Sequence, residues 1–148
     1  MIINNEMNLY FSAKSINESF ARSAVAAFVM ALDPTVSEIS DIKTAVSEAV
    51  TNAIVHGYKE YSGNVYINVK IKDSSKIIIK VRDKGCGIKD IEKAMQPLYT
   101  TGGDDRAGLG FTVMQSFMDK VMVRSKEGKG TIVTMEKSII PRGYNDRA

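Results

Sequence analysis

The chain has 148 residues, of which 44% are hydrophobic and 25% are charged. These values fit one domain with a substantial core, which we expect to occupy residues 1–140, followed by a polar tail at 141–148. No apolar run approaches the roughly 20 residues of a transmembrane helix, and the first ten residues lack the apolar stretch of a signal peptide. We therefore expect a cytoplasmic protein without a membrane partner.

The charged residues and the single cysteine exclude further classes. The 20 Lys and Arg residues against 17 Asp and Glu residues give a net charge of +3, and the basic residues are scattered among the acidic ones along the chain. This distribution argues against nucleic acid as a direct partner. Cys86 and His56 are the only residues of their types. They cannot build a zinc cluster, so any metal must be held by oxygen ligands.

The N-terminal part predicts a strand followed by a helix. Apolar and polar residues alternate over 6–12, which is the period of a half-buried strand. A capping box formed by Ser15 and Glu18 then predicts a helix that ends before Pro34. The apolar residues at helical spacing, which we expect to face the core, are Ile16, Phe20, Ala24, Ala27, Phe28 and Ala31.

A second helix is predicted from a capping box at Thr35 and Glu38 to a glycine C-cap at Gly57. Its expected apolar stripe comprises Ile39, Ile42, Val46, Val50 and Ala53. Glu48 and Asn52 are four residues apart, so they lie one turn apart on the same side of this helix, away from the stripe. They can reach one ligand together, although a solvated polar face has the same spacing.

The remaining elements complete a two-layer fold. The patterns predict strands at 65–72, 76–82, 120–125 and 131–137, a hairpin turn at 73–75, and helices at 90–95 and 110–119. The intervening segment 97–110 is rich in Gly, Thr and Asp, and we expect it to form a mobile lid. This order predicts an α+β sandwich with helices on one face of a mixed β-sheet.

The motif Asp83-x-Gly85-x-Gly87 directly follows a predicted strand. Its glycines permit close approach of a flat ligand, and the Asp83 carboxylate can accept a hydrogen bond from an amino group. A plain strand-exit turn has the same residues. A Rossmann fingerprint fits less well because Asp90 stands where its third glycine should be.

Two further glycine motifs follow. Gly108-Leu109-Gly110 stands at the start of a predicted helix, where free backbone N–H groups and the helix dipole favour phosphate. Gly130-Thr131 begins the last predicted strand. Taken singly, the first is also compatible with an ordinary loop-to-helix junction and the second with a hairpin turn.

In this order the motifs resemble those of the GHKL superfamily, which includes gyrase, Hsp90, histidine kinases and MutL. The segment 47–53 resembles its N box, the Asp83 motif its first glycine box, Gly108-x-Gly110 its second, and Gly130-Thr131 its terminal Gly-Thr pair. The resemblance covers about 37–137, and it implies the Bergerat ATP-binding fold with ATP and Mg²⁺ as cofactors.

The resemblance also implies roles for single residues. Asn52 would be the Mg²⁺ ligand, Asp83 the acceptor for the adenine amino group and Thr131 a further adenine contact. The implied nucleotide site comprises Asn52, Asp83, Gly85, Gly87, Thr100, Thr101, Gly108, Leu109, Gly110 and Thr131. Arg106 in the expected lid is a candidate for stabilising charge on the γ-phosphate, with a solvated loop arginine as the alternative.

Glu48 helps to predict which chemical group accepts the phosphoryl group. Attack by water or a serine hydroxyl benefits from a base that accepts a proton, whereas an imidazole attacks with a free lone pair. Histidine kinases typically carry Asn at this position, so Glu48 favours a hydroxyl or water nucleophile and a catalytic role. His56 is more simply a helix-end residue than an autophosphorylation site.

A finer resemblance is to the sporulation anti-sigma kinases of endospore-forming bacteria, in the segments 11–13, 17–22, 32–35, 47–58 and 96–101. It implies a homodimer that inhibits a sigma factor when ATP is bound and phosphorylates a serine of an anti-anti-sigma protein. Arg22 on the first helix is a candidate partner contact. Three alternatives stay open: a general-stress anti-sigma kinase, an ATP-gated binding module without kinase activity, and a detached histidine-kinase catalytic domain.

Overall fold

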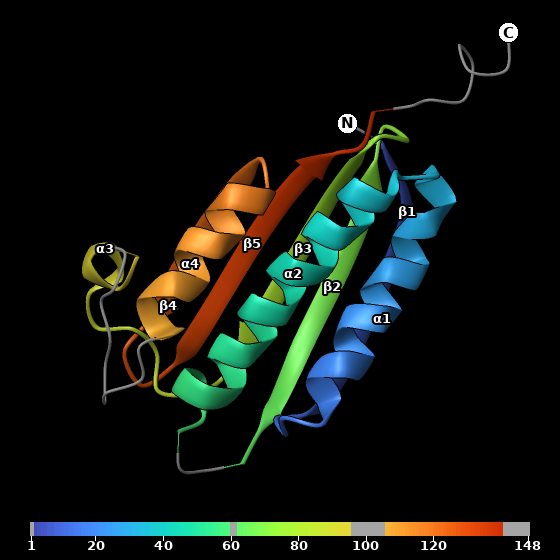
Figure 1. Ribbon diagram of the computed structural model, residues 1–148. Helices are drawn as coiled ribbons and strands as arrows, with labels where there is room; N and C mark the ends of the chain where they lie inside the picture. Colours follow the sequence, from blue (N-terminus) through green and yellow to red (C-terminus); the bar gives the residue numbers. More distant parts are fainter. Residues whose placement is uncertain (1, 60–61, 96–105, 141–148) are drawn as a thin grey trace, which may run out of the picture.

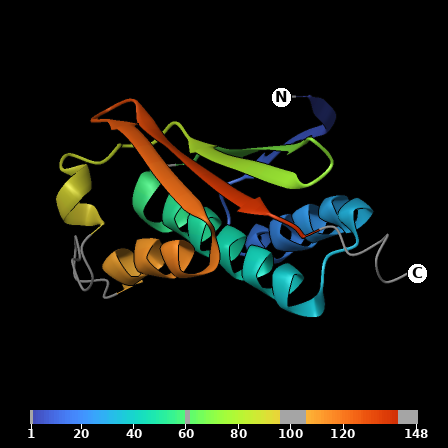
Figure 2. The ribbon, with the colours of Figure 1, turned by 90° about the horizontal axis from the view of Figure 1, so that it is seen from above.

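A five-stranded sheet forms one layer of the protein, and helices cover one of its faces (Figures 1 and 2). The computed structural model describes residues 2–59, 62–95 and 106–140, without the side chains of 106–109. Thr100, Thr101, most of the expected lid and the tail at 141–148 lie outside these ranges. No helix in the described ranges is long and apolar enough to cross a membrane.

The predicted strands are all present, in the spatial order β1-β2-β3-β5-β4. Their bounds are β1 Ile3–Ser12, β2 Asn64–Lys72, β3 Lys76–Asp83, β4 Lys120–Lys126 and β5 Gly130–Ser138. Every pair formed by the described strands is antiparallel, so the two-layer α+β architecture is confirmed but the sheet is not mixed. The reason is topological: β3 and β4 run the same way, but β5 inserts between them and pairs with both (Figure 1).

The first helix, α1 (Asn17–Val29), corrects two predictions. No side chain caps its start, because the N-cap position is Ile16 and not Ser15. The Glu18 carboxylate accepts a hydrogen bond from the Ser47 hydroxyl on the neighbouring helix. The face that packs inward is also different from the predicted one: Phe20 is 56% exposed, and Ile16, Ala27 and Ala31 are exposed as well. The residues buried on α1 are Ala21, Val25 and Val29. Small side chains thus allow α1 to pack closely in the helical layer.

The second helix, α2 (Val36–Asn52), forms as predicted at its start. The Thr35 hydroxyl and the Glu38 carboxylate make the reciprocal capping box, and the predicted apolar stripe faces the core. Its end differs from the prediction. The chain continues into a π-helical turn, η2 (Ala53–Gly57), and Gly57 does not adopt the left-handed conformation of a glycine C-cap.

The helix that carries the second glycine motif begins earlier than predicted. It is α4 (Arg106–Phe117), preceded by the short α3 (Ile91–Ala94). Gly108 and Gly110 therefore lie within the helix and not in a loop before it. α4 packs beside α2 over the sheet, and its Met114 is fully buried (Figure 1).

Candidate functional site

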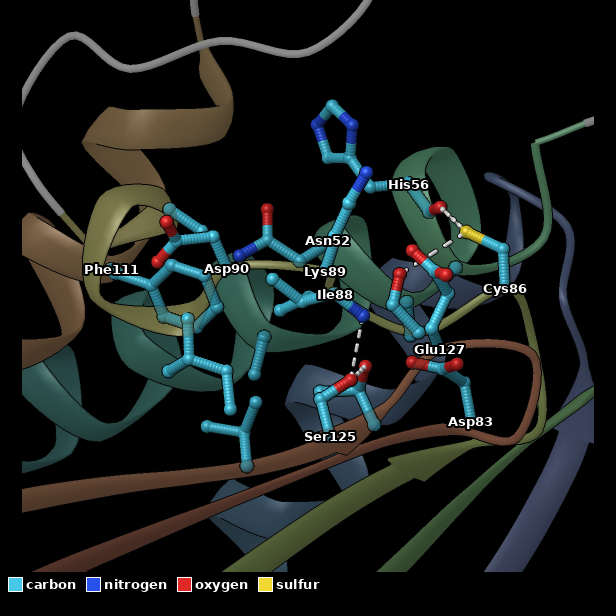
Figure 3. A pocket seen from close by; sticks show the side chains of 18 of the residues that line it. Asn52, His56, Asp83, Cys86, Ile88, Lys89, Asp90, Phe111, Ser125 and Glu127 are labelled. Atoms are coloured by element: carbon cyan, nitrogen blue, oxygen red, sulfur yellow. Dashed lines mark hydrogen bonds between the residues drawn. The ribbon is translucent and has the colours of Figure 1, made fainter.

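A cavity of about 870 Å³ opens beside the C-terminal end of α2 and extends between the loop after β3, α3 and α4 (Figure 3). Its lining includes four residues of the predicted nucleotide site, namely Asn52, Asp83, Gly87 and Thr131. The N box, the first glycine box and the terminal Gly-Thr pair, separated in sequence, thus meet around one pocket.

Asp83 occupies the inner wall of this pocket. It is the last residue of β3 and lies opposite Thr131 of β5 in the sheet register. Its side chain is buried, and the Gly85 backbone N–H donates a hydrogen bond of 2.9 Å to Oδ1. Burial raises the pKa of Asp83 above its ordinary value of 3.8, and backbone hydrogen bonds from Gly85 and Thr131 oppose this shift. A desolvated carboxylate gains strongly from a hydrogen-bond donor on a ligand.

The raised pKa predicts a pH-dependent effect of Asp83→Asn. In the folded state the carboxyl keeps its proton to a higher pH than the ordinary 3.8, so ionisation destabilises the fold progressively as pH rises from that value through the raised one. The free energy of unfolding of Asp83→Asn minus that of the wild type should therefore increase with pH over this window. Urea denaturation across the pH series measures it, and a flat difference would contradict the prediction.

Two glycines allow the loop after β3 to sit against the end of η2. A Cβ atom on Gly57 would lie 2.7 Å from the Asp83 carboxyl carbon, and one on Gly85 would lie 1.9 Å from the Gly57 carbonyl oxygen. The Cys86 backbone N–H donates to the same carbonyl at 2.8 Å. Gly85 is therefore required because the backbone of Gly57 lies against it. From the sequence, a glycine here is expected to make room for a ligand, whereas the structure shows that it makes room for η2.

The Gly85→Ala substitution should damage both stability and the pocket. Because the added methyl group would overlap a backbone carbonyl, the loop must shift, at a cost of about 1–3 kcal/mol. We expect the free energy of unfolding to fall by that amount and nucleotide binding to weaken, as measured by urea denaturation and calorimetry. Cys86→Ala in the same loop is the control and should cost much less; equal losses would rule out this explanation.

The β4–β5 turn closes the other side of the pocket. Gly87 and Gly130 have φ values of +75° and +112°, and a Cβ at either would overlap backbone. Ser125 Oγ accepts a hydrogen bond from the Ile88 N–H at 2.7 Å and lies 2.8 Å from Thr131 Oγ1. Sequence reasoning missed Ser125, because only the register that places it opposite Thr131 brings it to the pocket.

Other lining residues also escaped the sequence analysis. They include His56, Lys59, Cys86, Lys89, Asp90, Lys93, Phe111 and Glu127. Some of them could have been predicted, because they stand in or beside a motif: His56 follows the N box, and Cys86 lies within the first glycine box. Phe111 and Glu127 required the packing of α4 and of the β4–β5 turn.

Asn52 lies at the opposite side of the pocket from the β4–β5 turn, against the backbone of α4. A Cβ on Gly110 would lie 3.0 Å from Asn52 Nδ2 and 3.1 Å from Oδ1, so Gly110 makes room for this amide. Asn52 Nδ2 is buried and has no hydrogen-bond partner in the described part of the chain. Since an amide can rotate to exchange its oxygen and nitrogen, Asn52 has free capacity for a ligand.

The amide of Asn52 fits the requirements of Mg²⁺. This ion prefers oxygen ligands and commonly takes one or two protein groups, with phosphate oxygens and water completing its octahedron. No group of three or more His, Cys, Asp or Glu side chains suited to a metal occurs among the described residues. A lone amide is thus the kind of ligand that the resemblance implied.

The remaining predicted residues either do not line the pocket or have surroundings that the structure does not describe. Glu48 is half-buried, one turn before Asn52 on α2, but it is not among the pocket-lining residues in the described ranges. Arg106, Gly108 and Leu109 belong to the first turn of α4, and their surroundings lie outside the described atoms. Arg22 lies on α1, with Nε 3.6 Å from Glu18 Oε2, and it does not line the pocket.

Comparison with known proteins identifies the family. The model of the histidine kinase-like ATPase domain matches residues 11–137. The chain is 59% identical to the anti-sigma F factor of Caldanaerobacter subterraneus subsp. tengcongensis over 94% of its length and 97% of that relative. It is 56% identical to the anti-sigma F factor of Clostridium acetobutylicum over 92% of its length and 95% of that protein. The chain belongs to the anti-sigma F factor family.

Solved structures agree with this membership at the level of fold. A crystal structure of the RsbU and RsbW domains of Rv1364c from Mycobacterium tuberculosis superposes with a TM-score of 0.68 at 18% identity. The match covers 92% of this chain and 32% of that one. A blue-light activated histidine kinase from Erythrobacter litoralis gives a TM-score of 0.54 at 23% identity, covering 77% of this chain and 34% of that one. The chain thus shares its fold with parts of these two proteins.

Proposed function

We propose that this chain is an ATP-dependent protein serine kinase that also binds and inhibits a sporulation sigma factor. Its phosphoryl acceptor would be a serine of an anti-anti-sigma protein. Membership of the anti-sigma F factor family supports the regulatory role, and the histidine kinase-like ATPase domain supports the use of ATP.

The observation that best supports ATP use is the placement of Asn52 and Asp83 in one pocket. Asp83 offers a buried acceptor suited to the amino group of adenine, while Asn52 offers an amide with free hydrogen-bonding capacity. A nucleotide has a base at one end and phosphates with their metal ion at the other. Asp83 suits the amino group of the base, and Asn52 suits the metal ion at the phosphates. Thr131 and Ser125 lie beside Asp83 and extend the base-binding side.

The proposed transfer is a direct in-line displacement. Glu48 orients the incoming serine hydroxyl and accepts its proton, so that the oxygen forms a bond to the γ-phosphorus while the bond to the ADP oxygen breaks. Asn52 would hold Mg²⁺, and the bound ion neutralises charge on the phosphates. Arg106, at the start of α4, is proposed to stabilise the transferring group.

The proposed partners are a sigma factor, an anti-anti-sigma protein and a second copy of the chain, with no direct nucleic acid contact and a cytoplasmic location. Two exposed apolar side chains on the α1 side, Ile16 and Phe20, support a homodimer because burying them against a second copy is favourable. Arg22, whose side chain is 38% exposed on the same helix, is proposed as a partner contact.

Incubation with γ-labelled ATP and the partner proteins that copurify from native cells tests this function. Acid-stable label on a partner serine supports it. Acid-labile label on a histidine would identify a histidine kinase, and nucleotide-dependent complex formation without transfer would identify a binding module. Mass spectrometry of the copurified partners separates a sporulation sigma factor from a general-stress one.

A further inference from the structure

The face of the sheet opposite the helices is not covered by any described helix (Figure 2). At the end of this face nearest the β4–β5 turn there is a second hollow of about 450 Å³. Five basic side chains line it, all exposed: Arg82, Lys84, Arg124, Lys126 and Lys129. We call this surface the basic end.

The sheet register gathers these cations from separate stretches of sequence. Arg82 on β3 lies opposite Ile132 on β5, which in turn lies opposite Arg124 on β4. Adjacent strands are about 4.8 Å apart, so the two arginine positions are separated by about 10 Å. The basic residues that were scattered along the chain therefore form a cluster on the folded protein.

Among the described residues, no acidic side chain pairs with the cations of the basic end. Asp83 is the only acid that lines the described hollow, and its carboxyl is buried toward the nucleotide pocket. Glu136, farther along the same face, is within 4.0 Å of Lys76 and Lys120. None of the five basic residues forms an ion pair within the described part of the chain. Gathered like charges repel one another, and an anionic ligand would relieve that repulsion.

Tyr66, the aromatic residue that two of the cations contact, helps to distinguish the ligand. Arg82 and Lys84 lie 5.0 Å and 4.8 Å from the centroid of the Tyr66 ring, so cations occupy the ring that a nucleic acid base would otherwise use for stacking. The cluster is also compact, whereas single-stranded nucleic acid requires a longer basic groove. A second copy of the chain would bring like charges together. Charge complementarity therefore favours an acidic polypeptide.

We propose that the basic end is a docking site for an acidic segment of a partner protein. The basic end adjoins the nucleotide pocket, with which it shares Asp83, Ser125 and Thr131, but its five basic side chains do not line that pocket. An extended segment with carboxylates at alternate residues would place them about 7 Å apart on one face, which matches the spacing of the alternate residues Arg124 and Lys126 along β4.

Fluorescence polarisation with a labelled ten-residue glutamate peptide tests the proposal in the full-length chain. We expect saturable binding that weakens as salt increases, and a loss of at least about tenfold in affinity in the double variant Arg124→Gln/Lys126→Gln. The matched control is Lys70→Gln/Lys72→Gln, which removes the same charge from the other end of the same face. It should bind within about twofold of the wild type.

Unchanged ATP binding and thermal unfolding of both double variants exclude misfolding as the cause. Equal losses in the two variants would show a general charge effect and overturn the proposal, as would absence of saturable binding at low salt. Binding of a ten-nucleotide oligothymidylate, measured in the same way, tests the alternative that the ligand is a nucleic acid. If it binds the wild type more tightly than the peptide, and only the Arg124→Gln/Lys126→Gln variant loses it, the basic end is a nucleic acid site.

Discussion

Glu48→Gln is expected to lower the rate of phosphoryl transfer to the partner serine by about 10²–10⁴-fold, the usual contribution of general base catalysis. The amide has nearly the same shape as the carboxylate but cannot accept the serine proton. ATP binding should stay within about twofold of the wild type because Glu48 is not among the residues that line the described pocket. Single-turnover transfer of labelled phosphate, together with calorimetric ATP binding, measures the two effects separately.

Asp41→Asn is a suitable control for this variant. It removes one carboxylate from the same helix, where Asp41 lies 3.6 Å from Lys137 on the sheet. Its transfer rate should remain close to that of the wild type. A normal rate in Glu48→Gln would show that the base is another group, whereas equal losses in both variants would indicate a general effect of charge on α2.

Asn52→Ala is expected to weaken ATP binding in the presence of Mg²⁺ by at least about tenfold, or about 1.4 kcal/mol. The substitution removes the amide that is proposed to hold the ion, and alanine offers no replacement ligand. ATP binding in the presence of a chelator should change much less. Calorimetry with and without Mg²⁺ therefore distinguishes loss of an ion ligand from a general loss of the pocket.

The stability of Asn52→Ala supplies an independent readout. The buried Asn52 Nδ2 has no hydrogen-bond partner among the described residues, so removing it should leave the free energy of unfolding without nucleotide unchanged or slightly higher. Thr51→Ala, at the preceding position of α2, is the control and should keep the Mg²⁺ dependence. If Asn52→Ala instead weakens ATP binding equally with and without Mg²⁺, the amide contacts the nucleotide and not the ion.

The agreement between sequence and structure is best where local interactions decide the conformation. The alternation in β1 and the capping box at Thr35 depend on residues within a few positions of each other, and both formed as predicted. Asp83 and Thr131 line one pocket, as the order of the motifs and the family resemblance predicted, and their roles in nucleotide binding stay predictions. The catalytic role of Glu48 and the partner contact of Arg22 stay predictions.

The amino-acid sequence by itself determined the elements, the two-layer class and the motifs, because short-range patterns and the order of motifs carry that information. Only the tertiary structure decided which face of α1 packs inward, how β5 separates β3 from β4, why Gly85 must lack a side chain, and how Gly110 makes room for Asn52. Each of these depends on contacts between residues far apart in the chain. The basic end has the same origin: strand register brings Arg82 and Arg124 onto one face, and no local pattern encodes that register.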